Sequence, residues 1–223
     1  SASARLLLVC DHASADLPET YGLLGLDPTL LHRHIAWDIG AADLTRRLAD
    51  LLDATAVLTR YSRLLVDANR PLDNPTLIPE ASDGIKVPGN SGLRAEEVQL
   101  RIAAYHQPYH QAIGEALARI GVRRGVPGIM AIHSFTPIMD GFERPWQVGL
   151  LWNSDRRLLE PIQAAMAVDR SVTVGDNEPY SGKTTNYSMD LHGTERGLPN
   201  LSIEVRQDLI DTHHGAKEWA IWL

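Results

Sequence analysis

The chain has 223 residues, of which 44% are hydrophobic, so it is long and apolar enough to bury a substantial core. Its formal net charge of -7 and pI of about 5.7 argue against a nucleic-acid partner, because binding to phosphates requires excess positive charge. No shift in composition marks a boundary along the chain, and we expect residues 1–223 to form a single domain.

The single cysteine, Cys10, excludes an intramolecular disulfide and a cysteine-rich zinc site, and it suits a reducing compartment. No segment approaches the ~18 consecutive apolar residues that a membrane-spanning helix needs. The first residues also lack the pattern of a signal peptide. We therefore expect a cytoplasmic protein without a membrane partner, and no pattern in the sequence predicts its oligomeric state.

The first apolar run, residues 5–10, predicts a core strand that ends abruptly at Asp11 and His12. A histidine immediately after a buried strand lies where catalytic and ligand residues are common in α/β sheets. From this stretch alone, an ordinary loop histidine is the better interpretation.

Residues 38–52 have the apolar periodicity of an amphipathic helix, and Asp27 followed by Pro28 marks the start of a shorter helix before it. Asp38 stands at the beginning of the longer helix. It can cap the helix N-terminus, or it can be a metal ligand that the helix start holds in place. From spacing alone, capping is the better interpretation.

Residues 54–60 are rich in β-branched side chains and predict a strand. Residues 63–70 follow closely, with an apolar run between Arg63 and Arg70, and predict a second short, buried strand. The short connection indicates a hairpin or a sheet edge. We therefore expect a mixed sheet rather than a purely parallel one.

Two arginines and Asn69 flank this second apolar run, and guanidinium groups suit carboxylates and oxyanions. One interpretation is an anion-binding site at the carboxyl end of a strand, where open α/β sheets bind ligands. In an acidic protein, such a local positive site suits a small acidic substrate. The alternative is that Asp67 pairs with Arg63 or Arg70 and only stabilises a turn, and the segment alone does not distinguish the two.

Residues 71–92 lack periodicity and predict a long loop, of the kind that often forms a lid or a binding loop. Residues 93–120 predict one long helix, interrupted around Pro108. His106 and His110 lie on one face of this helix, as a zinc pair would. Because the glutamate of an H-E-x-x-H motif is missing, we favour structural or substrate-facing roles for both.

A second apolar run, residues 125–132, ends in His133 and repeats the arrangement at His12. Two strands that each present a histidine at the same end are typical of zinc sites in sheets, where imidazoles and one carboxylate leave an open coordination position. The adjacent Ser134 is not expected to be a nucleophile, because no G-x-S-x-G motif surrounds it.

We expect further strands at 146–152, 172–174 and 198–203, and helices at 155–168, 188–196 and the C-terminus. Glu204 emerges from the last of these strands. Burial there would raise its pKa toward the working range of a general base. The alternatives are an ordinary ion pair with Arg206 and a carboxylate that is satisfied at the end of the sheet.

Several of these segments resemble, in sequence order, the N-formylglutamate amidohydrolase family and its relatives, the zinc carboxypeptidase-like hydrolases, which include aspartoacylase-like and succinylglutamate desuccinylase-like enzymes. The matching segments are residues 11–12 with Pro18, and residues 38–41, 62–70, 105–110, 133–135, 178–182 and 203–209. The run from Arg63 through Asn69 and Arg70 is the most specific of them. The resemblance implies an α/β fold with three layers, α/β/α, and a central mixed sheet of the phosphorylase/hydrolase-like, zinc carboxypeptidase-like type.

The resemblance also implies one zinc ion per chain, held by His12, His133 and one carboxylate. The carboxypeptidase-like pattern places a glutamate three residues after the first histidine, where this chain has Ala15. We predict Asp38 as the third ligand, with Asp16 and Glu19 as alternatives.

The remaining roles follow from the same resemblance. Arg63 would stabilise the tetrahedral oxyanion, and Glu204 would activate the attacking water. Asn69 and Arg70 would bind the carboxylate of the acyl amino acid, with Ser134 and Tyr180 as further substrate contacts.

The implied function is a zinc-dependent amidohydrolase that cleaves the amide of small, acidic N-acyl amino acids. N-formyl-L-glutamate, cleaved to formate and glutamate, is the leading substrate. The stretch after His12 is Ala13-Ser14 rather than the His-x-Gly form of enzymes of histidine breakdown, which leaves room for another acyl substrate. The alternatives are a zinc peptidase acting on short peptides or cell-wall fragments, and a non-catalytic relative that only binds carboxylates.

Overall fold

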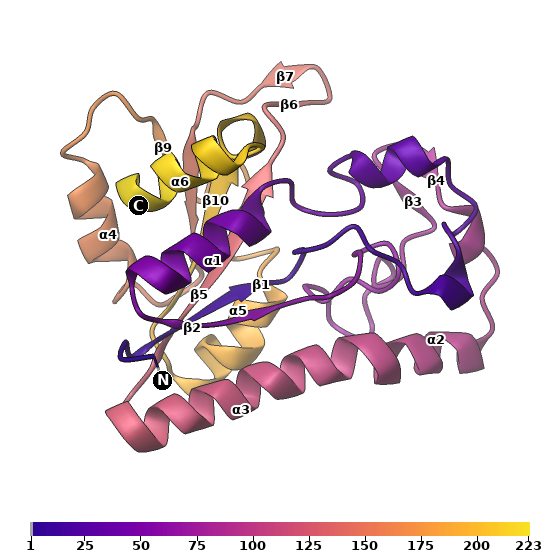
Figure 1. Ribbon diagram of the computed structural model, residues 1–223, viewed down its shortest axis with the longest axis horizontal. Helices are drawn as coiled ribbons and strands as arrows, with labels where there is room; N and C mark the ends of the chain where they lie inside the picture. Colours follow the sequence, from indigo (N-terminus) through magenta and orange to yellow (C-terminus); the bar gives the residue numbers. More distant parts are fainter. Residues whose placement is uncertain (1) are drawn as a thin grey trace.

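A six-stranded β-sheet lies at the centre of the molecule (Figure 1). In the computed structural model, which describes residues 2–223, the strands pair in the order β2-β1-β5-β10-β8-β9. Their bounds are β1 (Leu6–Cys10), β2 (Thr55–Leu58), β5 (Gly128–Phe135), β8 (Val148–Leu151), β9 (Val174–Asp176) and β10 (Asn200–Arg206). Strands β2, β1, β5 and β10 run parallel, whereas β8 and β9 run in the opposite direction. The prediction of an α/β fold with a mixed sheet is confirmed.

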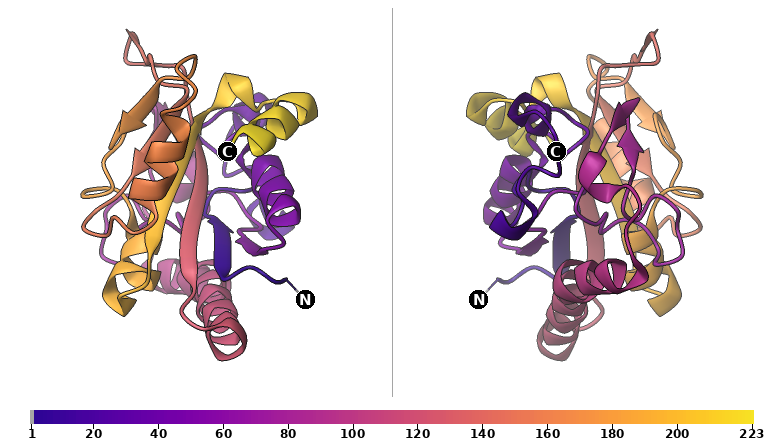
Figure 2. Two further views of the ribbon diagram at one scale, coloured as in Figure 1. Left: turned by 90° about the vertical axis from the view of Figure 1, so that its left-hand side faces the viewer. Right: turned by 90° about the vertical axis from the view of Figure 1, so that its right-hand side faces the viewer.

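Helices cover both faces of the sheet and complete three layers (Figure 2). Their bounds are α1 (Ala41–Leu51), α2 (Ala95–Arg101), α3 (Gln107–Arg124), α4 (Leu159–Met166), α5 (Tyr187–His192) and α6 (His213–Trp222). Buried residues of α1, α4 and α6 belong to the core on one face, and those of α3 and α5 belong to the core on the other. Among the described residues, no helix is long and apolar enough to cross a membrane.

The strands read as continuous apolar runs because both of their faces are covered. In β1, Leu8 packs in the core beneath α1 and α6, whereas Leu7 and Val9 pack in the core beneath α3. Successive side chains of a strand point to opposite faces, so each apolar run supplies both cores at once.

The long helix predicted for residues 93–120 is present, and Figure 1 shows α2 and α3 as one nearly straight rod. A single π-helical turn, Ile102–His106, joins them. Pro108 follows this turn and has no backbone N–H to continue an α-helical ladder, which accounts for the predicted interruption.

The prediction of a strand at residues 63–70 is wrong. Leu65 N–H donates to Ser62 O at 3.0 Å and Arg70 N–H donates to Asp67 O at 3.2 Å, so the segment is a succession of turns. Its apolar residues are buried, but they pack in small clusters under the surrounding loops rather than in the sheet. The predicted hairpin with β2 is likewise absent, because β2 pairs in parallel with β1 as the edge strand.

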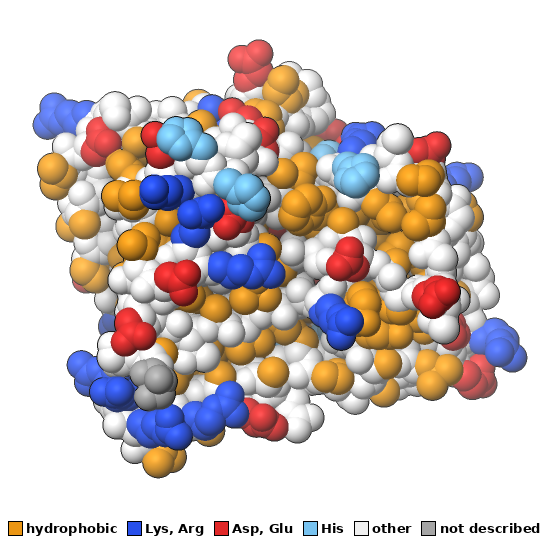
Figure 3. All heavy atoms as spheres, viewed as in Figure 1, with side chains coloured by type: hydrophobic (Ala, Val, Ile, Leu, Met, Phe, Trp, Pro, Cys, Tyr) orange, Lys and Arg blue, Asp and Glu red, His pale blue; other side chains and the backbone are white. Residues whose placement is uncertain are grey.

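Shorter elements complete the chain around the sheet. Two small hairpins are formed by β3 (Ala81–Ser82) with β4 (Ile85–Lys86) and by β6 (Ile138–Met139) with β7 (Phe142–Glu143). Turns of 3₁₀ helix occur at Glu19–Tyr21, Pro28–His32, Pro88–Asn90, Thr194–Arg196 and Gln207–Leu209. On the face shown in Figure 3, acidic and basic side chains are interspersed.

The parallel strands β1, β5 and β10 place their carboxyl ends at one edge of the sheet. His12 follows β1, whereas His133 and Glu204 lie opposite each other on β5 and β10. This edge carries the candidate site.

Candidate active site

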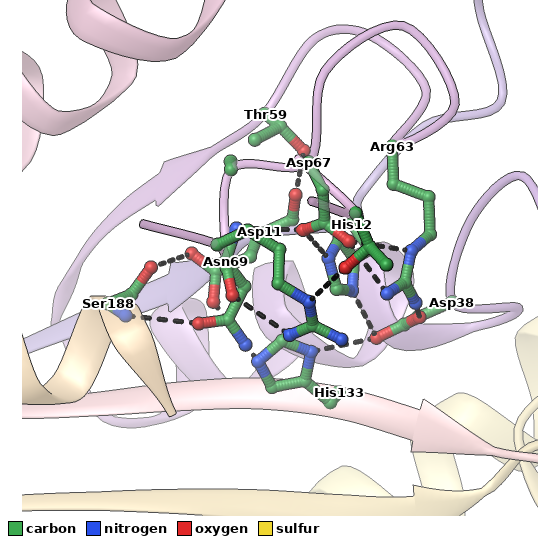
Figure 4. Close-up of polar contacts among 12 residues, drawn as sticks. Asp11, His12, Asp38, Thr59, Arg63, Asp67, Asn69, His133 and Ser188 are labelled. Atoms are coloured by element: carbon green, nitrogen blue, oxygen red, sulfur yellow. Dashed lines mark hydrogen bonds and ion pairs between the residues drawn. The ribbon is translucent and has the colours of Figure 1, made fainter. Parts of the chain in front are cut away.

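Two histidines and an aspartate converge at the carboxyl edge of the sheet. Asp38 Oδ2 lies 2.8 Å from His133 Nδ1 and 3.3 Å from His12 Nδ1. One donor atom of each residue lies within 4.8 Å of the others, and all three side chains are buried. The structure thus brings together the three residues that the sequence predicts as metal ligands (Figure 4).

The loop before α1 aims Asp38 at the histidines rather than along the helix. Asp38 N–H donates to His12 O at 3.0 Å, which fastens this loop to the end of β1. The N-cap of α1 is Gly40, with φ +79° and no side-chain cap. A Cβ at Gly40 would lie 2.1 Å from Ile210 O, so only glycine fits there. The interpretation of Asp38 as the helix cap is therefore wrong.

The second ring nitrogen of each histidine meets a further buried carboxylate (Figure 4). His12 Nε2 lies 2.8 Å from Asp67 Oδ1, and His133 Nε2 lies 3.1 Å from Asp11 Oδ2. An ionised carboxylate only accepts, so the hydrogen bond to Asp67 favours a proton on His12 Nε2 and leaves its Nδ1 lone pair facing Asp38. His133 Nε2 meets Asp11 in an ion-pair contact instead. Metal-binding histidines are commonly oriented by carboxylates in this way. The donor set therefore fits a metal ion with one open coordination position.

Two helices on the same face of the sheet, α3 and α5, hold the carboxylate of Asp11. Asp11 accepts hydrogen bonds from Tyr109 Oη at 2.8 Å and from Ser188 Oγ at 2.7 Å. Tyr109 belongs to α3 and Ser188 to α5, so the packing of that layer fixes the carboxylate behind His133. No local pattern in the sequence marks either donor, or marks Asp11 as a partner of His133.

The charges around the histidines favour a cation. Burial lowers the pKa of His133, but the carboxylates of Asp11 and Asp38 outweigh this effect and hold that pKa well above its usual range. The pKa of His12 is also raised, because Asp67 and Asp38 outweigh burial and the nearby Arg63. Such a negative environment stabilises a proton or a metal ion at this place.

Glu204 lies beside this centre, paired in register with His133 across β10 and β5. Its side chain is buried, and its Oε2 has no hydrogen-bond partner within residues 2–223. Burial raises the pKa of Glu204 to about 7, and Asp38 adds to the effect although His133 opposes it. The alternative ion pair is wrong, because Arg206 pairs with Asp208 at 2.8 Å.

A cavity of about 270 Å³ opens over these groups. Its lining includes all nine residues that the sequence analysis assigned to the site: His12, Asp38, Arg63, Asn69, Arg70, His133, Ser134, Tyr180 and Glu204. The alternative ligands Asp16 and Glu19 are exposed and lie outside this lining. The long loop contributes Ser82 and Asp83, which the sequence analysis did not single out.

Both interpretations of the segment 63–70 describe part of the geometry. Arg63 Nη2 donates to Asp67 Oδ2 at 2.7 Å, so the pair does stabilise a turn. The same guanidinium lines the cavity, and its Nη1 lies 3.7 Å from Asp38 Oδ1. An arginine held in this way is oriented toward the cavity before any ligand arrives.

Asn69 and Arg70 reach the cavity from the end of the same segment. Asn69 Oδ1 accepts from Ser188 N–H at 3.0 Å, which fixes the orientation of its amide. His106 Nε2 donates to Arg70 O at 3.0 Å. His106 and its neighbour His110, whose Nε2 donates to Ala68 O at 3.0 Å, therefore support this turn from behind.

Ser134 and Tyr180 are the last two of the nine predicted site residues, and each brings a hydroxyl group to the cavity. Ser134 Oγ donates to Ile39 O at 2.8 Å, so toward a ligand it can only accept a hydrogen bond. Tyr180 is partly buried, and burial together with the nearby Glu204 raises the pKa of its phenol.

Comparison with known proteins identifies relatives of this chain. The profile of the N-formylglutamate amidohydrolase family matches residues 4–211. An N-formylglutamate deformylase from Pseudomonas aeruginosa is 32% identical over 96 residues, which cover 39% of this chain and 36% of that protein. The matched stretch thus spans about a third of the length of this curated relative.

Two crystal structures share the fold. A gene product from Agrobacterium tumefaciens is 37% identical and superposes with a TM-score of 0.95 over 99% of this chain and 88% of its own. An N-formylglutamate amidohydrolase from Ralstonia eutropha JMP134 is 19% identical and superposes with a TM-score of 0.66 over 100% of this chain and 94% of its own. At that identity the second likeness shows the fold alone, and it agrees with the three-layer architecture.

Proposed function

Since this chain belongs to the N-formylglutamate amidohydrolase family, we propose that it is a zinc-dependent amidohydrolase that cleaves small N-acyl amino acids, with N-formyl-L-glutamate as the leading substrate. One observation carries the proposal: His12, His133 and Asp38 face a common point, with the partnerless carboxyl oxygen of Glu204 beside them. This set holds a metal-ligand triad and a separate base in one buried place.

Zinc fits the donor set because two imidazole nitrogens and one carboxylate oxygen are typical of its catalytic sites. When bound, the ion would polarise the amide carbonyl and make a water molecule acidic near neutral pH. Asp67 and Asp11 orient the two imidazoles for this role.

Glu204 is suited to move the proton. With a pKa of about 7 it can take a proton from the attacking water and later give it to the leaving amine. Arg63 would meet the negative charge that develops on the carbonyl oxygen in the transition state, where donors held in advance are most effective. These two side chains are our proposed catalytic residues.

Asn69 and Arg70 would bind the carboxylate of the acyl amino acid, because the amide and the guanidinium reach the cavity from one turn. Ser134 would accept a hydrogen bond from the substrate, and Tyr180 would close one side of the pocket. The sequence likeness to a deformylase supports formyl as the acyl group.

A second cavity beside the first supports a zinc peptidase as the alternative function. A neighbouring cavity of about 430 Å³ shares Asn69, Arg70 and Thr185 with the first and would give a longer substrate room to extend. This reading predicts turnover of dipeptides in preference to formylated amino acids.

Metal analysis and a substrate panel test the proposal together. We expect freshly purified protein to contain about one zinc ion per chain, to lose activity with a chelator and to regain it with zinc. It should hydrolyse N-formyl-L-glutamate faster than other N-acyl amino acids and faster than dipeptides. Absence of zinc, with no turnover of the panel after zinc is added, would leave only the non-catalytic, carboxylate-binding relative.

A further inference from the structure

Arg144 is a buried cation without an acidic partner. It follows β7, and only 7% of its surface is exposed. Within residues 2–223, no carboxylate lies within 4.0 Å of its guanidinium. The other fully buried arginine, Arg101, is paired with Glu97 at 2.9 Å. Because buried charges are normally paired, the isolation of Arg144 calls for a reason.

The guanidinium of Arg144 lies directly behind the wall of the active-site cavity. Its Nη1 donates to Thr136 O at 3.2 Å and to Thr136 Oγ1 at 3.3 Å. Its Cζ lies 4.9 Å from the ring centroid of Tyr180 and 5.7 Å from that of Phe135. All three neighbours line the cavity. Neutral oxygens and aromatic rings therefore stand between this positive charge and any ligand.

Within residues 2–223, none of the acidic side chains that line the cavity pairs with Arg144. Asp38 faces both histidines, and Glu204 lies beside His133. Asp83, at the rim, pairs with Arg33 at 3.1 Å and lies 3.4 Å from His34. An anion that enters the cavity would therefore be the first acidic partner of Arg144.

We propose that Arg144 is a specificity-determining residue, whose uncompensated charge behind Tyr180 and Thr136 selects substrates that carry a second carboxylate. This inference rests on the proposed function. One carboxylate of such a substrate would meet Asn69 and Arg70, and the other would be drawn to the wall in front of Arg144. The charge of Arg144 acts strongly through the cavity wall, because protein screens a charge less than water does. The guanidinium of Arg144 also packs over the ring of Tyr180 and holds it in place.

The test compares N-formyl-L-glutamate with N-formyl-L-glutamine, which has nearly the same shape but lacks the side-chain charge. We expect Arg144→Gln to reduce the ratio of the two kcat/KM values by about tenfold or more, mainly through KM, because the lost charge attracts the bound substrate through a poorly screening wall. Arg144→Lys, which keeps the charge, should retain most of the preference. Arg101→Gln is the matched control, because Arg101 is also buried and lies over a tyrosine ring, Tyr21, at 4.7 Å.

A second pair of variants covers the case in which Arg144→Gln does not fold. Thr136→Asp places a carboxylate beside Nη1 and would neutralise Arg144 without removing it. It should lower the glutamate preference, whereas the uncharged Thr136→Asn should not.

The outcomes separate this inference from the proposed function. If the wild-type protein hydrolyses N-acyl amino acids but does not distinguish the glutamate form from the glutamine form, Arg144 has no such role. The same holds if Thr136→Asp, or a folded Arg144→Gln, slows both substrates equally. If the zinc-loaded wild-type protein hydrolyses neither compound, the proposed function itself fails.

Discussion

Two groups of buried or partly buried histidines in this protein have opposite surroundings. His12 and His133 are bordered by carboxylates at both ring nitrogens. His106, His110 and His192 lie between α3 and α5, and within residues 2–223 no carboxylate forms an ion pair with them. Their hydrogen-bond partners are main-chain carbonyl groups and each other. The surroundings of the first group favour a cation, and those of the second group favour neutral rings.

The pKa values follow this difference. Those of His12 and His133 are raised, because carboxylates outweigh burial. Burial lowers the pKa of His110 to about 4, with a further contribution from His106, and it lowers the pKa of His192 to about 4, with a contribution from His110. Burial thus acts in the same direction in both groups, and the acidic neighbours decide the outcome.

The neutral group supports the turn that carries Asn69 and Arg70. His110 Nε2 donates to Ala68 O at 3.0 Å, and His110 Nδ1 lies 2.9 Å from His192 Nε2. Because a carbonyl group only accepts, His110 must carry its proton on Nε2 and accept from His192 at Nδ1. A second proton on His110 would turn that acceptor into a donor, so the hydrogen bond in this direction belongs to a neutral His110.

The largest expected effect comes from removing one histidine of the first group. His133→Gln should reduce the bound metal to near zero and lower kcat by at least about 10³-fold, because the carbonyl loses its electrophilic partner. His192→Gln is the control from the second group and should keep its metal. Atomic absorption and steady-state kinetics measure both quantities. Full metal content in His133→Gln would remove this residue from the ligand set.

Glu204→Gln tests the proposed general base separately from the proposed metal ligands. We expect kcat to fall by about 10²- to 10⁴-fold, as for loss of a general base, while the metal content stays at its wild-type level. An unchanged kcat would contradict the role of Glu204, and loss of metal would make it a ligand.

The outer carboxylates should have a smaller effect. Asp11→Asn keeps the shape of the side chain but weakens the acceptor behind His133, and metal affinity should fall by about 10- to 100-fold. Competition with a chromophoric chelator measures the change. Asp43→Asn is the control, because Asp43 contacts the exposed His213 at 2.8 Å, away from the cavity. Equal affinity in the two variants would mean that Asp11 does not tune the metal.

The strands of the sheet and three residues of the cavity lining could be predicted because one rule of α/β folds covers them, whereas the other lining residues were assigned through the family resemblance. Apolar runs that end in polar residues mark the carboxyl ends of buried strands, and those ends meet at one edge. The rule succeeded for His12, His133 and Glu204, which all line the same cavity. It failed for residues 63–70, whose apolar run is buried under loops instead of in the sheet.

The supporting contacts could not be predicted, because they depend on how distant segments pack. Ser188 and Asp11 are 177 positions apart and come from different layers. Arg144 stands in no recognisable local pattern, and its proposed role depends on the lack of a carboxylate partner within residues 2–223. Such features appear only once the side chains of several elements are placed together.

The smallest expected effect is on stability in acid, where the two groups of histidines act in opposite directions. The pKa of His110 and His192 is about 4 in the folded protein, against an ordinary value of 6.5. As the pH falls from 6.5 toward 4, these histidines gain a proton in the unfolded chain but not in the folded protein, so the free energy of unfolding decreases. In metal-free protein, His12 and His133 have raised pKa values and contribute stability below pH 6.5 that disappears as the pH rises. Acid therefore lowers the contribution of the second group to the stability of the fold and raises that of the first.

His192→Gln isolates the second contribution, because glutamine can still donate to His110 but does not titrate. Urea unfolding of metal-free protein between pH 7 and pH 4.5 should show wild-type stability falling relative to the variant by on the order of 1 kcal/mol per pH unit. His214→Gln, at an exposed position on α6, should parallel the wild type. If the wild-type and His192→Gln curves stay parallel, the neutral group does not titrate in this range, and the contrast between the two groups reduces to the metal site alone.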